Sequence, residues 1–113
     1  MRIKCGDIFF AECSSSEGSS IIKGYRPVIV IRALEGSTVL HVIPLTSRNK
    51  RPISQLHVPI VGHGLKHLSV ALVEQLRLID KSLLGKRIGN LSGSAEMERI
   101  LKHLTSYLNP QAA

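Results

Sequence analysis

Aromatic residues and long apolar runs are scarce in this sequence. Its 113 residues include no tryptophan, two tyrosines and two phenylalanines, too few for a broad platform that stacks many nucleobases. No apolar run reaches the roughly 18 residues of a membrane-spanning helix. An acid and a glycine interrupt the first seven residues, so we expect no signal peptide and a cytoplasmic protein. The composition predicts one domain over residues 1–113.

Cysteine is also rare, and this limits the chemistry open to the chain. Cys5 and Cys13 are the only two cysteines, so the sequence provides neither a disulfide framework nor a closed zinc site. We expect both thiols to be buried and structural. His63 and His67 have the spacing of a zinc-binding pair on a helix, but the glycines on either side of His63 argue against a helix. We therefore expect no metal and no cofactor.

Acidic residues are in the minority. Eight Asp and Glu stand against 15 Lys and Arg, which gives a formal net charge of +7 at pH 7. This balance favours a polyanionic partner, either nucleic acid or an acidic protein segment. Charge alone does not choose between these two classes of partner.

The apolar pattern predicts a mainly β fold that ends in one helix. Short strands are expected at 7–13, 24–31, 38–45, 55–60 (an edge strand, because it contains Pro59), 69–74 and 86–91. Loops are expected at 14–20 and 48–52, and one helical turn over 81–84 is expected to begin at Asp80 and stop at Gly85. Ser92 or Ser94 is expected to cap the helix, whose apolar residues are Met97, Ile100, Leu101, Leu104, Tyr107 and Leu108. Several strands are apolar on both faces and one helix covers little of them, so we expect a small barrel that forms a homodimer.

The segment from Gly24 to Ile31 carries the clearest functional signal. Its second half, 28–31, is a run of β-branched apolar residues, which is typical of a strand buried on both faces. Arg26 stands at the entrance of this strand. Pro27 stiffens the backbone there, so the guanidinium is held in a defined place.

The next strand brings hydroxyl groups to the same place. A turn at 35–37 predicts antiparallel pairing that sets Thr46 and Ser47 beside Arg26. A guanidinium beside a hydroxyl can bind a phosphate, and the following basic residues would extend such a site: Arg48, Lys50 and Arg51. The alternative is a structural ion pair of Arg26 with Glu12 or Glu74. Neither a Gly-x-Ser-x-Gly motif nor a phosphate-binding Gly-x-x-x-x-Gly-Lys-Ser/Thr loop occurs.

Five segments in this order resemble the MazF/PemK family of toxin endoribonucleases, the toxin halves of bacterial toxin–antitoxin pairs. They are Lys4-Cys5-Gly6-Asp7-Ile8-Phe9-Phe10, Gly24-Tyr25-Arg26-Pro27-Val28, Pro44-Leu45-Thr46-Ser47, the segment 69–81 with Gln75-Leu76-Arg77-Leu78-Ile79-Asp80-Lys81, and 89–97. The resemblance covers nearly the whole chain.

The resemblance implies an SH3-like barrel of five to seven strands with a C-terminal helix, α+β and mainly β, in the MazF/CcdB-like toxin fold. It implies a homodimer that cleaves single-stranded RNA at short motifs without metal, by 2′-OH attack, and so inhibits translation. Arg26 and Thr46 are the residues carried over as catalytic. The residues expected to bind substrate are Ser19, Ser20, Lys23, Tyr25, Ser47, Arg48, Lys50, Arg51 and Gln75. An acidic antitoxin of the MazE/PemI kind is the expected protein partner.

The segment 18–24 departs from the family. The family commonly has Gly-Ser-Glu-Gln-Gly there, whereas this chain has Gly18-Ser19-Ser20-Ile21-Ile22-Lys23-Gly24. Base specificity is therefore not carried over. Two other functions stay open: a toxin of the same fold that binds a protein such as DNA gyrase, and a degenerate member that only binds RNA or antitoxin.

Overall fold

The computed structural model describes residues 2–13, 24–47, 56–109 and 111. The expected loops at 14–20 and 48–52 lie outside these residues. Over the described ranges the chain forms seven strands and one α-helix at its C-terminal end, which confirms the prediction of a mainly β fold. None of the helices in these ranges is long and apolar enough to cross a membrane.

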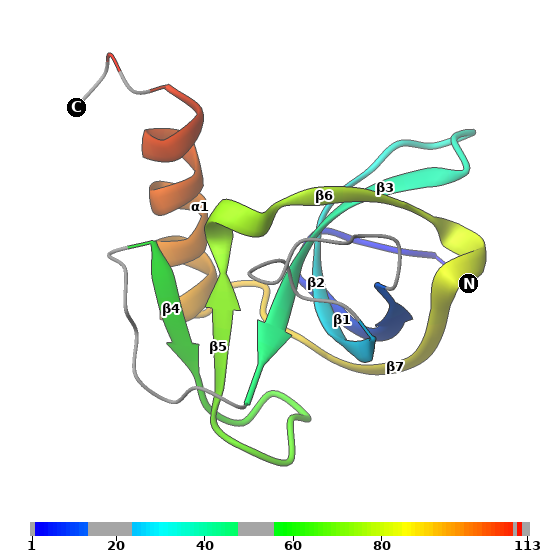
Figure 1. Ribbon diagram of the computed structural model, residues 1–113, viewed down its shortest axis with the longest axis horizontal. Coiled ribbons are helices and arrows are strands. Elements are labelled where there is room, and N and C mark those ends of the chain that lie inside the picture. Colours follow the sequence, from blue (N-terminus) through cyan, green and yellow to red (C-terminus); the bar gives the residue numbers. More distant parts are fainter. Residues whose placement is uncertain (1, 14–23, 48–55, 110, 112–113) are drawn as a thin grey trace.

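The strands form one antiparallel sheet that curls strongly (Figure 1). They are β1 (Asp7–Glu12), β2 (Tyr25–Ala33), β3 (Val39–Thr46), β4 (His57–Ile60), β5 (Ser69–Leu72), β6 (Arg77–Asp80) and β7 (Leu84–Asn90), with 3₁₀ turns η1 (Val73–Gln75) and η2 (Lys81–Leu83) and the helix α1 (Ala95–Leu108). The strand order is β4-β5-β3-β2-β1-β7, and β6 also pairs with β3. The edge position predicted for the Pro59 strand is therefore confirmed, and β3 has three partner strands.

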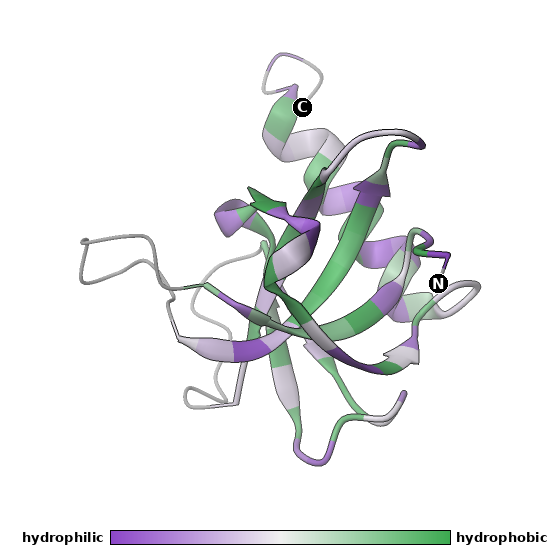
Figure 2. Ribbon diagram, turned by 90° about the vertical axis from the view of Figure 1, so that its right-hand side faces the viewer, coloured by the Kyte–Doolittle hydropathy of each residue, from purple (hydrophilic) through white to green (hydrophobic). Residues whose placement is uncertain are grey.

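The apolar run of β2 separates two hydrophobic cores. Ile29 packs in one core with Ile43, Leu45 and the helix residues Met97, Ile100 and Leu104. Val28 and Val30 point the other way and pack with Phe9, Leu40 and Val42 inside the curled sheet. Because successive residues of a strand point to opposite faces, an uninterrupted apolar run is what a strand between two cores requires. Figure 2 shows the resulting green colour along the strands.

Helix α1 covers the core on the β4 side. Ser94 is its N-cap, and its hydroxyl accepts a hydrogen bond from the Met97 N–H at 3.1 Å. Ser92, the other candidate cap, instead donates to the Cys5 carbonyl at 3.0 Å. The three other apolar helix residues of the predicted face stay exposed: Leu101, Tyr107 and Leu108. The helix therefore buries a narrower face than its sequence predicts.

Four details differ from the sequence-based expectation. The strand 69–74 ends at Leu72, because the chain turns through η1, where the Leu76 N–H donates to the Val73 carbonyl. After this turn comes β6, which the sequence did not predict. It pairs with the first half of β3, Val39 to Val42. Gly85 does not stop a helical turn but lies within β7, which begins at Leu84. Cys5 is exposed in the turn before β1, whereas Cys13 is buried as expected.

Removing the helix cap should lower stability. We expect Ser94→Ala to reduce the free energy of unfolding by about 1 kcal/mol, because the Met97 N–H loses its acceptor. Ser106→Ala, at an exposed position within α1, is the matched control and should leave stability unchanged or slightly raised. Urea denaturation measures both, and equal values for the two variants would contradict the cap.

Candidate functional site

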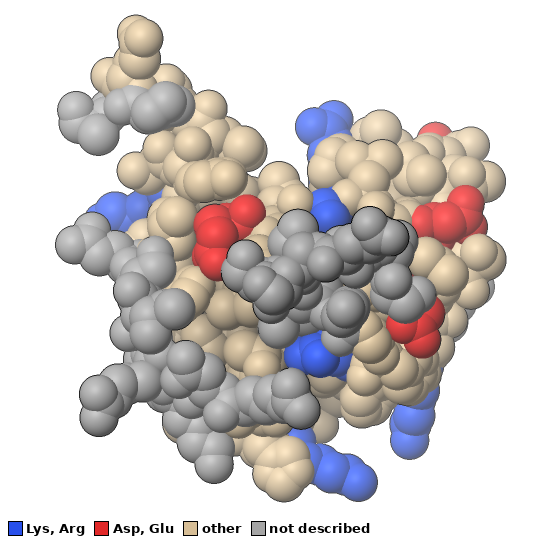
Figure 3. Space-filling model, in the orientation of Figure 1, with Lys and Arg blue, Asp and Glu red and all other residues tan. Residues whose placement is uncertain are grey.

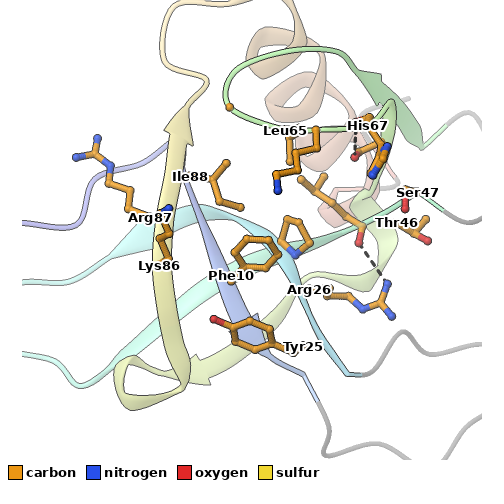
Figure 4. A pocket seen from close by; sticks show the side chains of 15 residues that line it. Phe10, Tyr25, Arg26, Thr46, Ser47, Leu65, His67, Lys86, Arg87 and Ile88 are labelled. Atoms are coloured by element: carbon orange, nitrogen blue, oxygen red, sulfur yellow. Dashed lines mark hydrogen bonds between the residues drawn. The ribbon is translucent and has the colours of Figure 1, made fainter.

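A cavity of about 700 Å³ opens where strands β1, β2, β3 and β7 meet the segment 64–69 (Figure 4). Its lining residues are Phe10, Tyr25, Arg26, Pro27, Leu45, Thr46, Ser47, Gly64, Leu65, Lys66, His67, Ser69, Lys86, Arg87 and Ile88. The lining is half apolar and half polar in residue type, and its charged side chains are basic. It therefore offers a place for an extended anionic ligand with apolar parts.

The structure brings Arg26 and Thr46 together as the hairpin pattern predicts. Strands β2 and β3 pair with Val28 opposite Pro44, so the start of β2 lies beside the end of β3. The Arg26 guanidinium donates a hydrogen bond of 3.5 Å to the carbonyl of Leu45, the residue before Thr46. Thr46 is 7% exposed and still lines the cavity. A fixed cation and a hydroxyl thus face the same space.

The other predicted site residues fall into three groups. Tyr25 and Ser47 line the same cavity as Arg26. Gln75 does not line it; in η1 its side-chain oxygen accepts a hydrogen bond from Arg77 at 3.2 Å. Six residues lie outside the described part of the chain: Ser19, Ser20, Lys23, Arg48, Lys50 and Arg51. Their role as substrate contacts stays a prediction.

Arg87 is a cavity residue that sequence reasoning missed. Its guanidinium donates to Asp7 at 2.8 Å, and Asp7 is completely buried. The same carboxylate accepts hydrogen bonds from the Asn90 amide at 2.7 Å and the Lys4 N–H at 2.8 Å. Asp7 therefore orients Arg87 at the wall of the cavity. The two residues are 80 positions apart, so no local signal could have joined them.

The segment 61–68 contributes the opposite wall through Gly64, Leu65, Lys66 and His67. His63 has φ of 56° and Gly64 has φ of 93°, which excludes the helix that a His63/His67 zinc pair would need. A side chain at Gly64 would overlap the Ile88 carbonyl, so the glycine lets this wall pack against β7. His63 also contacts Glu96 of α1 at 3.4 Å. The Glu96 backbone N–H and His63 hold the pKa of the Glu96 carboxyl below its usual range.

The described charged residues that line the cavity all have the same sign. Its described lining contains Arg26, Lys66, Lys86 and Arg87 and no acid. Elsewhere the charges are mixed: on the face in Figure 3, described basic side chains stand apart from one another among acidic ones. The described charged residues of the cavity lining are therefore all basic, which suits a phosphodiester.

The structure bears on Glu74, one of the two expected ion-pair partners of Arg26, and on the reactivity of the Cys13 thiol. Glu74, a candidate ion-pair partner of Arg26, contacts His57 at 3.0 Å, and its other oxygen has no hydrogen-bond partner among the described residues. Burial raises the pKa of the Cys13 thiol, so it stays protonated and is a poor nucleophile.

In the described ranges, no three His, Cys, Asp or Glu side chains gather as a metal site.

The fold and the site define a small β protein with a basic cavity of about 700 Å³ at its strand ends. The profile of the family described as "PemK-like, MazF-like toxin of type II toxin-antitoxin system" matches residues 4–108. The chain belongs to this family. It is also 36% identical over 96 residues to "Endoribonuclease EndoA" of Bacillus subtilis (strain 168), covering 80% of this chain and 82% of that protein.

Solved structures with the same fold are more distant in sequence. MazF (Form-I) from Deinococcus radiodurans superposes with a TM-score of 0.79 at 20% identity, covering 95% of this chain and 96% of that one. An endoribonuclease in complex with its cognate antitoxin, from Mycobacterial species, gives a TM-score of 0.73 at 16% identity over 92% of each chain. At these identities the likeness is one of fold.

Neutralising Asp7 should destabilise the protein. We expect Asp7→Asn to lower the free energy of unfolding by about 2 kcal/mol or more, because one buried acceptor would become a donor facing Arg87 and Asn90. Asp80→Asn is the matched control: this exposed carboxylate caps η2 through the Ser82 N–H, and an asparagine caps equally well. Similar losses in urea denaturation for both variants would contradict the role given to Asp7.

Proposed function

We propose that this chain is a sequence-selective, metal-independent endoribonuclease that cleaves single-stranded RNA, and that it is the toxin of a bacterial toxin–antitoxin pair. It would act on mRNA in the cytoplasm and so inhibit translation and growth. The observation that carries the proposal is the meeting of Arg26 and Thr46 in one basic cavity. Family membership and the name of the Bacillus subtilis relative support the same activity.

The proposed reaction uses the 2′-hydroxyl of the RNA as its own nucleophile. Its oxygen attacks the adjacent phosphorus, the bond to the 5′-oxygen breaks, and the products end in a 2′,3′-cyclic phosphate and a 5′-OH. Charge builds on the phosphate oxygens in the transition state. Arg26 stabilises that charge, and Thr46 holds a non-bridging oxygen. An arginine stays protonated in proteins, so we assign Arg26 an electrostatic role rather than that of a base.

Loss of either residue should slow cleavage strongly. Single-stranded RNA incubated with the purified protein in EDTA should give fragments with 2′,3′-cyclic phosphate and 5′-OH ends. Arg26→Ala and Thr46→Ala should each slow the reaction by about 10²-fold or more, as expected for removal of a transition-state donor. Arg32→Ala is the control, because Arg32 is an exposed arginine on the same strand, away from the cavity.

Each failure of this experiment has a distinct meaning. Cleavage that survives in both variants would place the active site elsewhere, and cleavage lost in EDTA would contradict metal independence. Sequencing the fragment ends gives the cut motif. Growth inhibition that persists in Arg26→Ala, with DNA gyrase captured by the protein, would favour the protein-binding toxin instead.

An acidic antitoxin of the MazE/PemI kind is the proposed protein partner. The net charge of +7 and the acid-free described lining of the cavity would attract an acidic segment, which would then block access of RNA. A solved relative of the same fold is in complex with its cognate antitoxin. A gene for a small, strongly acidic protein immediately upstream would support this partner.

We further propose a homodimer. Large apolar side chains stay exposed on the β3–β6 ribbon, where Val39 is 37% and Leu78 is 55% exposed, and a second copy could cover them. Light scattering at micromolar concentration should report twice the chain mass. Leu78→Lys should shift the equilibrium toward monomer, whereas Lys102→Glu, at an exposed position on α1, should not. A strict monomer for the unmodified protein would contradict the proposal.

A further inference from the structure

The rings of Phe10 and Tyr25 form a stacked pair at one side of the cavity. In the β1–β2 ladder Phe10 lies opposite Pro27 and Tyr25 lies opposite Glu12, so the two rings are diagonal neighbours on one face of the sheet. Their centroids are 5.3 Å apart and their planes differ by 12°. Tyr25 is nevertheless 58% exposed. Most of an aromatic side chain is therefore open to solvent next to a basic cavity.

We propose that this ring pair is a stacking subsite that holds one nucleobase of the RNA while Arg26 and Thr46 act on its backbone. The inference rests on the proposed function and adds the part of the substrate that the cavity recognises besides phosphate. Every base has an aromatic face, so such a contact accepts all four bases and fixes the position of the strand more than its sequence.

The Tyr25 ring is held in place by its surroundings. Phe10 supports one face, and Gly85 of β7 lies directly against the hydroxyl: a side chain at Gly85 would overlap that oxygen. Gly85 does not have a positive φ, so what its position requires is space and not an unusual backbone conformation. A ring that is already ordered loses little entropy when a base stacks on it.

Cations flank the ring pair. Figure 4 shows the rings between Arg26 of β2 on one side and Lys86 of β7 on the other, while the Arg87 guanidinium, also on β7, points away from the rings. Arg87 is anchored by the buried Asp7 and is itself 45% exposed. A nucleotide strand carries a phosphate on either side of each base, so a ring with cations on both sides matches this repeat.

The described aromatic residues provide a stacking position for one base. Of the four aromatic residues in the sequence, Phe9 is fully buried and Tyr107 lies on α1, away from the cavity. The scarcity of aromatics, which excludes a broad stacking platform, leaves this single pair. An acidic peptide would engage the cations as well, but it would gain nothing specific from an exposed aromatic face between them.

Tyrosine fluorescence tests the proposal directly. The chain has two tyrosines and no tryptophan, so Tyr107→Phe leaves Tyr25 as the sole tyrosine. A random pool of 2′-fluoro single-stranded RNA lacks the attacking hydroxyl and binds without being cut. We expect it to quench the Tyr25 emission to saturation. An abasic sugar-phosphate strand of the same length should bind through the cations without quenching.

Binding constants of variants separate stacking from charge and from fold. Tyr25→Leu should raise the Kd of the RNA pool by about 5- to 150-fold and leave the Kd of the abasic strand unchanged. Tyr107→Leu, the matched loss of an exposed tyrosine, should change neither Kd. Gly85→Ala should push the Tyr25 ring aside and give an intermediate loss for the RNA pool alone. Thermal unfolding checks that each variant folds.

The outcomes also separate this subsite from the nuclease proposal. Equal effects of Tyr25→Leu on both strands, or no effect on either, would overturn the subsite even if Arg26 and Thr46 prove catalytic. Base-dependent quenching without any RNA cleavage would keep the subsite and overturn the nuclease. A dimer lost in Tyr25→Leu with RNA binding unchanged would assign the ring pair to a protein contact.

Discussion

The two-sided burial of β2 and β3 is the constraint on which the rest of the molecule depends. Val28 and Val30 belong to the core inside the curled sheet, and Ile29 and Ile43 belong to the core beneath α1. A shift of one residue in either strand would exchange the side chains of the two cores. The register of this hairpin is therefore strongly specified, and both cores must form together with it.

The geometry of the candidate site follows from that register. Arg26 lies half-buried near the start of β2, and Thr46 is the last, still buried residue of β3, just before the exposed Ser47. Because the register is fixed, the relative position of the two residues in the strands is fixed as well. Pro27 stiffens the backbone between the core and Arg26, so the two residues proposed as catalytic are attached to rigid strands.

Short-range patterns in the sequence predicted the strands and the helix start whose structure depends on neighbouring residues. Three such features depend only on a few adjacent residues: the buried strand at 28–31, the edge strand with Pro59, and the cap of α1 by the serine before it. The pairing of Arg26 with Thr46 was predictable because a short turn joins their strands. Asp7 and Arg87 meet only through the β1–β7 ladder, whose register shifts twice. Strand β6 was missed because its pairing with β3 depends on the turn η1, which the apolar pattern does not reveal.

The cavity thus has walls of two kinds. The wall formed by β2 and β3 carries the proposed chemistry and cannot move without disturbing both cores. The wall formed by β7 and the segment 61–68 carries Lys86, Arg87 and Lys66, and it is attached through the Asp7 carboxylate and the Gly64–Ile88 contact. Arg87 is tied to the buried Asp7, whereas Lys86 is exposed, so Lys86 can change at little cost to folding. This position of the cavity lining can therefore vary while Arg26 and Thr46 on the other wall stay in place.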